Sequence, residues 1–155
     1  MDVELKAATL ANLDELLILV RAYHDFECIK HTDESRRAAL LPLLAEDAAP
    51  GRVWLILSSG QTVGYVAICF GYSIEFGGRD AFIDELYIVE SARDKGIGTG
   101  VLERVKSEAA RLGVLVLHLE VGLDNQRARR LYSRAGFESR DRFHLMSCLV
   151  HNLGC

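Results

Sequence analysis

The stretch Arg93-Asp94-Lys95-Gly96-Ile97-Gly98-Thr99-Gly100 is the most informative part of this 155-residue chain. It follows an apolar run at residues 82–89, typical of a buried strand, and it opens a helical pattern of apolar residues over 98–112. A glycine-rich turn at the start of a helix presents unpaired backbone N–H groups at the positive end of the helix dipole. Phosphate groups bind such turns, and the two basic side chains add positive charge there. The sequence therefore predicts a pyrophosphate-binding loop.

Two other phosphate-binding loops fit this stretch less well. A P-loop ends in Gly-Lys-Ser/Thr, whereas the order here is Lys95-Gly96. A dinucleotide-binding fingerprint shares the spacing of Gly96 and Gly98, and Glu120 stands where a ribose-binding acid would stand. Its third small residue, however, would fall at Val101, and residues 90–95 separate the strand from the first glycine. A redox domain that binds NAD is thus the less favoured alternative.

A second motif follows at residues 119–137, where a short helical segment is bounded by Asp124 or Asn125 as N-cap and by a glycine at its end. Together with Arg93-x-x-Gly96-x-Gly98, this segment closely resembles the GNAT superfamily of acetyl-CoA-dependent N-acetyltransferases. That family carries Gln/Arg-x-x-Gly-x-Gly/Ala at its pyrophosphate loop, followed by an Asn…Ala…Tyr…Gly-Phe pattern. The matching residues here are Asn125, Ala128, Tyr132, Gly136 and Phe137. The resemblance is strong over residues 82–137 and unspecific before them.

Composition agrees with one compact domain over residues 1–155. Half of the residues are apolar, which is enough for a core without metals or disulfides. The net charge of −4 is spread along the chain and does not favour nucleic-acid binding. The four cysteines form no CxxC pair and the five histidines have no metal-ligand spacing. With no leader or membrane-spanning stretch in the sequence, we expect a cytoplasmic protein without a metal and without a membrane partner.

The pattern of apolar residues predicts alternating strands and helices. Strands are expected at 3–7, 53–57, 63–74, 114–121 and 143–149, with another ending at Val89 after a tight Gly77-Gly78 hairpin. Helices are expected at 11–26, at 33–45 with Asp33 as cap, at 98–112, and ending near residue 135. The predicted fold class is α/β or α+β in a single layered domain. The resemblance implies a mixed, splayed central sheet flanked by helices.

The resemblance also implies acetyl-CoA as cosubstrate and a set of residues that bind it. The backbone of Leu86 and Ile88 would face the thioester carbonyl, and Asn125 would bind the pantetheine arm or cap its helix. The pyrophosphate would be bound by the side chains or backbone N–H groups of Arg93, Asp94, Lys95, Gly96, Ile97, Gly98, Thr99 and Gly100. Asp94 is a departure, because the family usually has glycine there, and its charge lies beside the phosphates.

Acetyl transfer to an amine needs a base, because an alkyl amine with a pKa of about 10.4 is protonated at neutral pH. Asp84 and Glu85 lie on the strand that lines the family's reaction centre. Alternation places Asp84 on the face of Leu86 and Ile88, and Glu85 on the other face with Ile83. Both acids are candidates, with Glu85 preferred for its longer reach; an ordinary solvated acid is the alternative for each.

The resemblance implies that Tyr132 is the general acid for the departing thiolate, and the alternative is a tyrosine that only packs its helix on the sheet. The acceptor cleft would draw on acids and aromatic residues from the first helices and a hairpin, which suit a cationic small amine such as a polyamine, an aminoglycoside or an amino-acid derivative. These residues are Tyr23, His24, Asp25, Phe26, Glu27, His31, Tyr72, Glu75 and Arg79. A peptide acceptor and a catalytically silent acyl-CoA-binding module are the alternatives. A homodimer through the C-terminal strand is implied by the resemblance alone.

Overall fold

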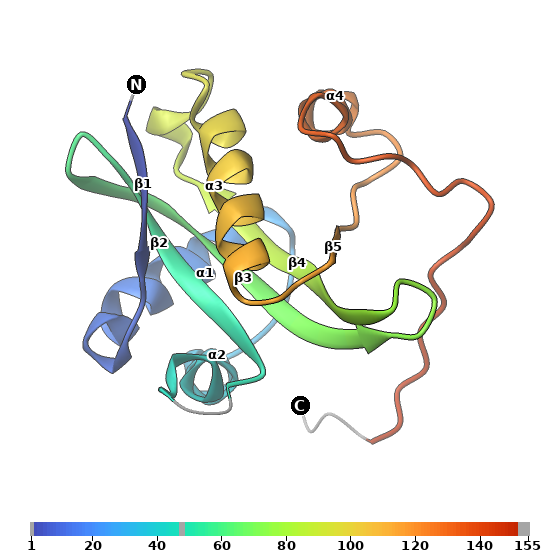
Figure 1. Cartoon of the computed structure of the whole chain (residues 1–155). Coiled ribbons are helices and arrows are strands. Elements are labelled where there is room, and N and C mark those ends of the chain that lie inside the picture. Colours follow the sequence, from blue (N-terminus) through green and yellow to red (C-terminus); the bar gives the residue numbers. More distant parts are fainter. Residues whose placement is uncertain (1, 47–48, 152–155) are drawn as a thin grey trace.

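A computed structural model describes residues 2–46 and 49–151. It contains one five-stranded sheet in the order β1-β2-β3-β4-β5, and the figure shows it strongly twisted (Figure 1). The strands are β1 (Val3–Ala7), β2 (Gly51–Ser58), β3 (Gln61–Ser73), β4 (Gly78–Ile88) and β5 (Val116–His118). Neighbouring strands are antiparallel except β4 and β5, which are parallel. The expected mixed sheet is confirmed, and it differs from the parallel sheet of dinucleotide-binding domains.

Helices cover both faces of the sheet. On one face lie α1 (Leu13–Phe26) and α2 (Asp33–Leu40), and on the other lies α3 (Ile97–Arg111), while α4 (Gln126–Arg134) stands beside β5 (Figure 1). Within residues 2–46 and 49–151, three 3-10 helices occupy connections: η1 (Leu10–Asn12), η2 (Leu41–Leu44) and η3 (Glu90–Ala92). As far as α4, the element order matches the predicted alternation of strands and helices.

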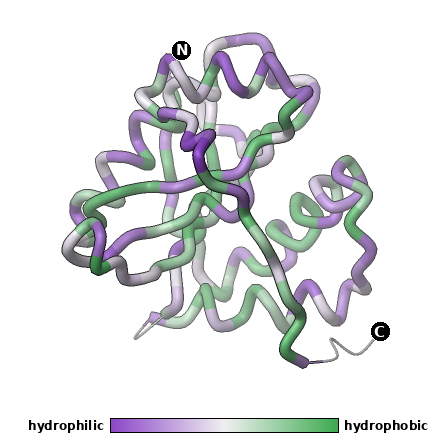
Figure 2. Tube along the Cα trace, turned by 90° about the vertical axis from the view of Figure 1, so that its right-hand side faces the viewer, coloured by the Kyte–Doolittle hydropathy of each residue, from purple (hydrophilic) through white to green (hydrophobic). Residues whose placement is uncertain are grey.

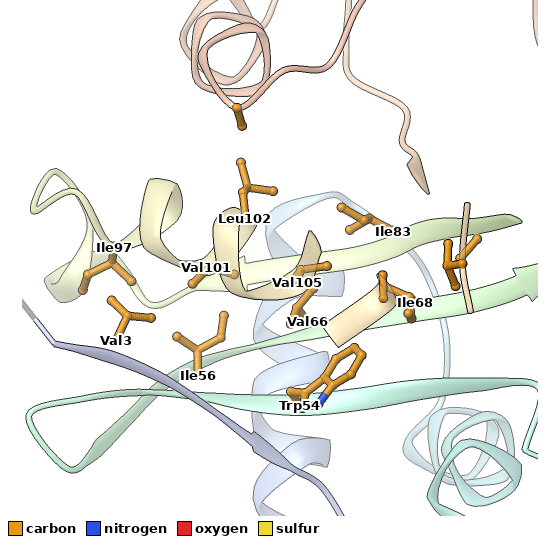
Figure 3. Close-up of a cluster of buried hydrophobic side chains, with 14 of the residues drawn as sticks. Val3, Trp54, Ile56, Val66, Ile68, Ile83, Ile97, Val101, Leu102 and Val105 are labelled. Atoms are coloured by element: carbon orange, nitrogen blue, oxygen red, sulfur yellow. The ribbon is translucent and has the colours of Figure 1, made fainter. Parts of the chain in front are cut away.

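Each face of the sheet has its own apolar core, because side chains alternate along each strand. On β3, Val66 and Ile68 pack toward α3, whereas Tyr65 and Ala67 pack toward α1. Figure 3 shows the core between the sheet and α3, where one face of α3 packs its side chains against the sheet. That face is formed by Ile97, Val101, Leu102, Val105 and Ala109. Its spacing of three and four residues is the helical pattern seen in the sequence.

Leu102→Ala is expected to lower the free energy of unfolding by about 2–5 kcal/mol, because Leu102 is fully buried and its removal leaves a cavity. Since about 1 kcal/mol corresponds to roughly 2–4 °C in a chain of this size, Tm falls by about 5–15 °C in a thermal-unfolding scan. Leu10→Ala is the matched control, because Leu10 is 60% exposed. Equal shifts for the two variants would contradict this account of the core.

Two predicted strands differ from the structure, because one is shorter than predicted and the other is absent from the described residues. The 114–121 strand is only β5, which pairs with β4 from Asp80↔Val116 to Phe82↔His118. Leu119 follows β5 and packs against the core without pairing to a strand. Its apolar side chain therefore contributes to the core although the sheet does not extend to it. The expected 143–149 strand is absent from the described part of the chain. Those residues are exposed and have no regular secondary structure.

The second helix also differs from its prediction. Its N-cap is Thr32, whose hydroxyl accepts the Ser35 N–H at 3.1 Å, so Asp33 belongs to the first turn instead. The α-helix ends at Leu40 and continues as the 3-10 helix η2, whose second residue is Pro42. Proline has no N–H for an α-helical hydrogen bond, which accounts for the change.

A β-bulge in β4 moves Ile83 out of its predicted face, while Asp84, Leu86 and Ile88 line one cleft that Glu85 does not line. Ala67 is opposite Glu85 and Ile68 is opposite Ile83, so Asp84 is the extra residue without a partner on β3. Beyond the bulge the alternation changes phase, and Ile83 packs in the same cluster as Leu86 instead of sharing a face with Glu85.

In the described residues, no helix combines the length and apolar character needed to cross a bilayer.

Candidate active site

A cleft of about 1000 Å³ opens where β4 and β5 diverge. Its floor is the part of β4 beyond the short β5 pairing, and its walls are the start of α3, residues 119–122 and α4. The end of α1 closes the cleft at its far side. Of the predicted site residues, those that line it are Asp84, Leu86, Ile88, Arg93, Asp94, Gly96, Ile97, Gly98, Thr99, Asn125 and Tyr132. Glu85, Lys95 and Gly100 do not line it.

The backbone of β4 offers unpaired polar groups to this cleft. Val89 donates its N–H to the carbonyl of Val63 at 2.8 Å, and antiparallel alternation then turns the N–H groups of Leu86 and Ile88 to the opposite edge. In keeping with this, the Ile88 carbonyl accepts the Nε of Arg93 at 2.8 Å. Since β5 pairs only as far as Phe82, the cleft lies along this open edge.

The predicted pyrophosphate-binding loop (residues 93–100, the phosphate loop) lies at the N-terminus of α3. Gly96 is the helix N-cap, and its φ of +74° is a left-handed conformation that glycine adopts without strain. The first N–H groups of α3 have no helical partner and lie against the cleft. Gly98 lets α4 come close, since a Cβ there would be 3.0 Å from the Leu131 side chain. Gly100 faces Val3 of β1 instead, so its role in the structure is packing.

The charged side chains of the loop differ in their placement. Arg93 lies in the cleft, with its guanidinium carbon 5.0 Å from the Phe26 ring centroid and its terminal nitrogens not used by the bond to Ile88. The Lys95 ammonium is turned away and donates to the Ser91 carbonyl at 2.9 Å. Asp94 has a φ of +63°, which fits the family's usual glycine, and its carboxylate pairs with Arg127 of α4. This ion pair neutralises the charge that stood out in the sequence.

On α4, Asn125 and Tyr132 have distinct surroundings. The Asn125 side chain accepts the Ala128 N–H at 3.1 Å, so Asn125 is the N-cap of α4 as well as part of the cleft wall. Tyr132 packs edge-on against Phe137 and faces the cleft. Burial, and then the nearby Glu27 carboxylate, raise the pKa of Tyr132 above its ordinary value. The phenol therefore keeps its proton at neutral pH.

The two candidate bases point to different places. Asp84, the bulge residue, lies in the cleft and is exposed. Glu85 lies on the α1 side of the sheet, where its Oε2 is 2.7 Å from His24 Nε2 and its Oε1 accepts the Tyr65 hydroxyl at 2.9 Å. Both Glu85 oxygens therefore already have protein partners, and of the two candidates it is Asp84, not the preferred Glu85, that lies in the cleft.

The α1 end of the cleft is formed by Tyr23, Phe26 and Glu27. Burial, Glu27 and more distant charges including Asp84 raise the pKa of Tyr23 to about 12. The hairpin residues expected beside them lie elsewhere. Tyr72 is 78% exposed outside the cleft, Glu75 pairs with Arg140, and Arg79 donates to the Leu112 carbonyl.

Sequence reasoning missed several residues of this region. The cleft is also lined by residues near the end of β5 and its pairing with β4: Phe82, Glu120, Val121 and Gly122. They line it because the chain diverges from β4 after β5, and no local sequence pattern shows where the pairing of β5 with β4 ends. Tyr65 and Arg36 were also missed as polar partners behind β4. In the sequence Tyr65 stands among apolar residues, and only its contact with Glu85 in space reveals its role.

No group of three possible metal-ligating side chains occurs among the described residues. The described cysteines, Cys28, Cys69 and Cys148, are unpaired, and Cys155 lies outside the described residues. The cleft offers a helix N-terminus for an anion and an open strand edge for an extended chain, and its lining includes the Asp84 carboxylate and the phenols of Tyr23, Tyr87 and Tyr132.

Comparisons with known proteins agree with this geometry. The model of the acetyltransferase (GNAT) family matches residues 16–137. An uncharacterised N-acetyltransferase of Methanocaldococcus jannaschii is 31% identical over 84 residues, covering 54% of this chain and 37% of that protein. The thialysine N-epsilon-acetyltransferase of Mus musculus is 27% identical over 145 residues, covering 85% of this chain and 82% of that protein.

Among solved structures, an integron cassette protein from the mobile metagenome of Cole Harbour salt marsh has a TM-score of 0.82 at 30% identity. The match covers 96% of this chain and 92% of that one. By contrast, the chain spans well under half of the length of the archaeal relative. The family match extends over most of the chain and includes β4, the phosphate loop and Tyr132, so the chain belongs to the GNAT acetyltransferase family.

Proposed function

We propose that this chain is one catalytic domain that transfers an acetyl group from acetyl-CoA to a primary amine of a small molecule, by direct attack with both substrates bound. The observation that carries the proposal is the cleft itself, in which the phosphate loop, the open edge of β4 and the Tyr132 phenol lie along one continuous surface. A catalytically silent acyl-CoA-binding module would have no use for a protonated phenol and a free carboxylate at the same end of the cleft.

The cleft fits the chemical groups of coenzyme A. The N-terminal N–H groups of α3 would hold the pyrophosphate, and Arg93 would add its free guanidinium nitrogens. Arg127 lies in the cleft wall beside the loop, where its pairing with Asp94 offsets the negative charge of that aspartate. The N–H groups of Leu86 and Ile88 would bind the pantetheine amides and the thioester carbonyl. When bound, acetyl-CoA supplies the activated acetyl group.

The chain's own residues would perform the proton transfers. Asp84 would accept the proton of the ammonium form of the acceptor, directly or through a water molecule. We now favour Asp84 over Glu85, because only Asp84 lies in the cleft and both Glu85 oxygens are occupied. A β4 N–H would stabilise negative charge developing on the carbonyl oxygen. Tyr132 would donate its proton to the sulfur that departs.

The α1 end of the cleft supports a cationic amine as the acceptor. Glu27 and Asp84 place negative charge there, and Tyr23 and Phe26 supply aromatic faces that attract an alkylammonium group. The mouse relative is named for thialysine, a small amine. We propose an acceptor of that general kind, such as a polyamine, an aminoglycoside or an amino-acid derivative.

Thiol release from acetyl-CoA over a panel of amines tests the proposed function. We expect turnover with small diamines or amino-acid amines that is at least tenfold above hydrolysis and above turnover of lysine-containing peptides. Calorimetric titration with CoA and with NAD is the companion measurement, and only CoA should bind. Binding of CoA without turnover of any amine would instead support a catalytically silent acyl-CoA-binding module. Binding of NAD but not of CoA would refute the proposed function.

We also propose a homodimer that forms through the C-terminal segment in a cytoplasmic setting. The described end of the chain exposes a run of apolar side chains that a second copy would cover (Figure 2). They are Phe143, Leu145, Met146, Leu149 and Val150. Sedimentation equilibrium of the protein and of a Leu145→Asp, Leu149→Asp variant tests this, since only the variant should be monomeric.

A further inference from the structure

A chain of hydrogen bonds runs behind β4, on the side away from the phosphate loop. The Nε2 of His24 lies 2.7 Å from Glu85 Oε2, and the Tyr65 hydroxyl donates to Glu85 Oε1 at 2.9 Å. The Nε of Arg36 donates to His24 Nδ1 at 3.2 Å, and its NH1 donates to Asp33 Oδ1 at 2.8 Å. We call these residues the buried network.

The network fixes the protonation of its members. An arginine guanidinium only donates hydrogen bonds, so His24 Nδ1 must accept, and the ring proton stands on Nε2. That proton points to Glu85, which accepts from both its neighbours as a carboxylate. Burial and Glu85 raise the pKa of Tyr65 well above its ordinary value, so its hydroxyl also stays a donor. Every contact has one donor and one acceptor.

These polar groups are withdrawn from solvent. Tyr65 is fully buried, His24 and Arg36 are 8% and 7% exposed, and the Glu85 side chain is 18% exposed. Leaving such groups without partners is costly, so the network holds its elements in one arrangement. It joins α2 through Arg36, α1 through His24, β3 through Tyr65 and β4 through Glu85.

The joined positions are next to residues of the cleft. His24 follows Tyr23 and precedes Phe26 and Glu27, which form the acceptor end of the cleft. Glu85 follows Asp84, whose place in the cleft depends on the β-bulge. Holding His24 to Glu85 therefore holds the α1 wall at a set distance from the bulge residue. Among the described residues, this is the one hydrogen bond that joins α1 directly to β4.

We propose that Glu85 and His24 are positioning residues for the acceptor amine, and that the buried network sets the gap between Asp84 and the α1 wall. This inference rests on the proposed acetyltransferase function and extends it. It assigns the specificity for the acceptor to groups that do not touch it, and it gives Glu85 a role other than general base.

Glu85→Gln and Glu85→Ala separate this role from general-base catalysis. Glutamine can keep the network, because its oxygen accepts from His24 and its amide donates to the Tyr65 oxygen. We expect Glu85→Gln to keep kcat, its pH profile and the KM for the amine within about threefold. Glu85→Ala should raise the KM for the amine by about tenfold or more, with kcat and CoA affinity little changed. A general base would instead lose about 10²-fold or more in kcat in both variants, and that result overturns the proposal.

Asp80→Ala is the matched control. Asp80 is also on β4, is equally covered at 18% exposed, and pairs with a histidine, His118, at 3.3 Å, yet it lies outside the cleft. Its loss should leave the KM for the amine unchanged. If Asp80→Ala raised that KM as much as Glu85→Ala does, general loosening of β4 would explain both effects and the inference would fail.

Nitrogen NMR of the histidine rings gives a readout that needs no turnover. We expect one ring with a proton on Nε2 and none on Nδ1 at pH 7, and we expect His24→Gln to remove this signal. A doubly protonated His24 ring would contradict the network. Because this measurement is independent of the acceptor, a protein that acetylates no amine yet shows the signal would refute the proposed function while leaving the network intact.

Discussion

Tyr132→Phe is expected to lower kcat by about 10²–10⁴-fold while the dissociation constant of CoA changes by less than about threefold. The phenol lies in the cleft wall on α4, and only its hydroxyl is removed. The ring and its edge-on contact with Phe137 remain, so α4 and the cofactor surface keep their shape. Without the hydroxyl, the thiolate must depart unprotonated or take a proton from water. Stopped-flow thiol release and calorimetry measure the two quantities.

The pH dependence of the wild-type protein follows from the same group. A general acid acts in its protonated form, and burial together with Glu27 raises the pKa of Tyr132 above its ordinary value of about 10. Activity that depends on this proton is therefore present throughout the neutral range and is lost only as pH rises through the raised pKa. A decline of kcat centred below pH 9 would assign the acid to another group.

Two other tyrosines serve as controls for Tyr132. Tyr72→Phe removes the same hydroxyl from an exposed hairpin and should leave kcat unchanged. Tyr23 provides the more stringent control, because its phenol lines the same cleft and its pKa is also raised, to about 12. Tyr23→Phe should alter the KM for the amine more than kcat. If Tyr23→Phe lost as much kcat as Tyr132→Phe, the two phenols would have to share the proton transfer.

The parts of this site that could be predicted from sequence are those set by local chemistry. The N–H groups of the phosphate loop depend on a glycine with positive φ directly before a helix, and both signals lie within a few residues. The Asn125 cap is likewise local, since its partner is the N–H three residues on. The resemblance then linked these two segments, and their common place in one cleft agrees with it.

The parts that sequence reasoning could not supply depend on distant partners. His24 and Glu85 are 61 residues apart, and neither sequence neighbourhood shows that they meet. The bulge at Asp84 depends on how β3 pairs with β4, and a single extra residue moves Ile83 to the face of Leu86. Alternation alone put Ile83 on the wrong face for this reason, although it did separate Asp84 from Glu85, and only Asp84 lies in the cleft. The early end of β5 could not be predicted for the same reason, because the length of β5 depends on its pairing with β4 and not on its apolar pattern.

Asp84→Asn is expected to lower kcat/KM for the amine by about 10²–10³-fold at pH 7, with CoA affinity retained. Asparagine has nearly the shape of aspartate, so the bulge and the cleft persist, but the group can no longer accept a proton. The deficit should shrink as pH rises. An alkyl amine with a pKa of about 10.4 gains its neutral form tenfold per pH unit below that value, and the variant then depends less on a base.

The ratio of wild-type to variant kcat/KM between pH 7 and pH 9 is the decisive measurement. Asp80→Asn is the matched control, because Asp80 is on the same strand but outside the cleft and should show no deficit at any pH. A deficit in Asp84→Asn that stays constant with pH would assign Asp84 to binding the charge of the acceptor. In that case the proton would have to pass to water or to another carboxylate of the cleft lining, Glu27 or Glu120, since both oxygens of Glu85 already accept hydrogen bonds. The pH dependence of one ratio thus distinguishes a carboxylate that removes the proton from one that only attracts the cation.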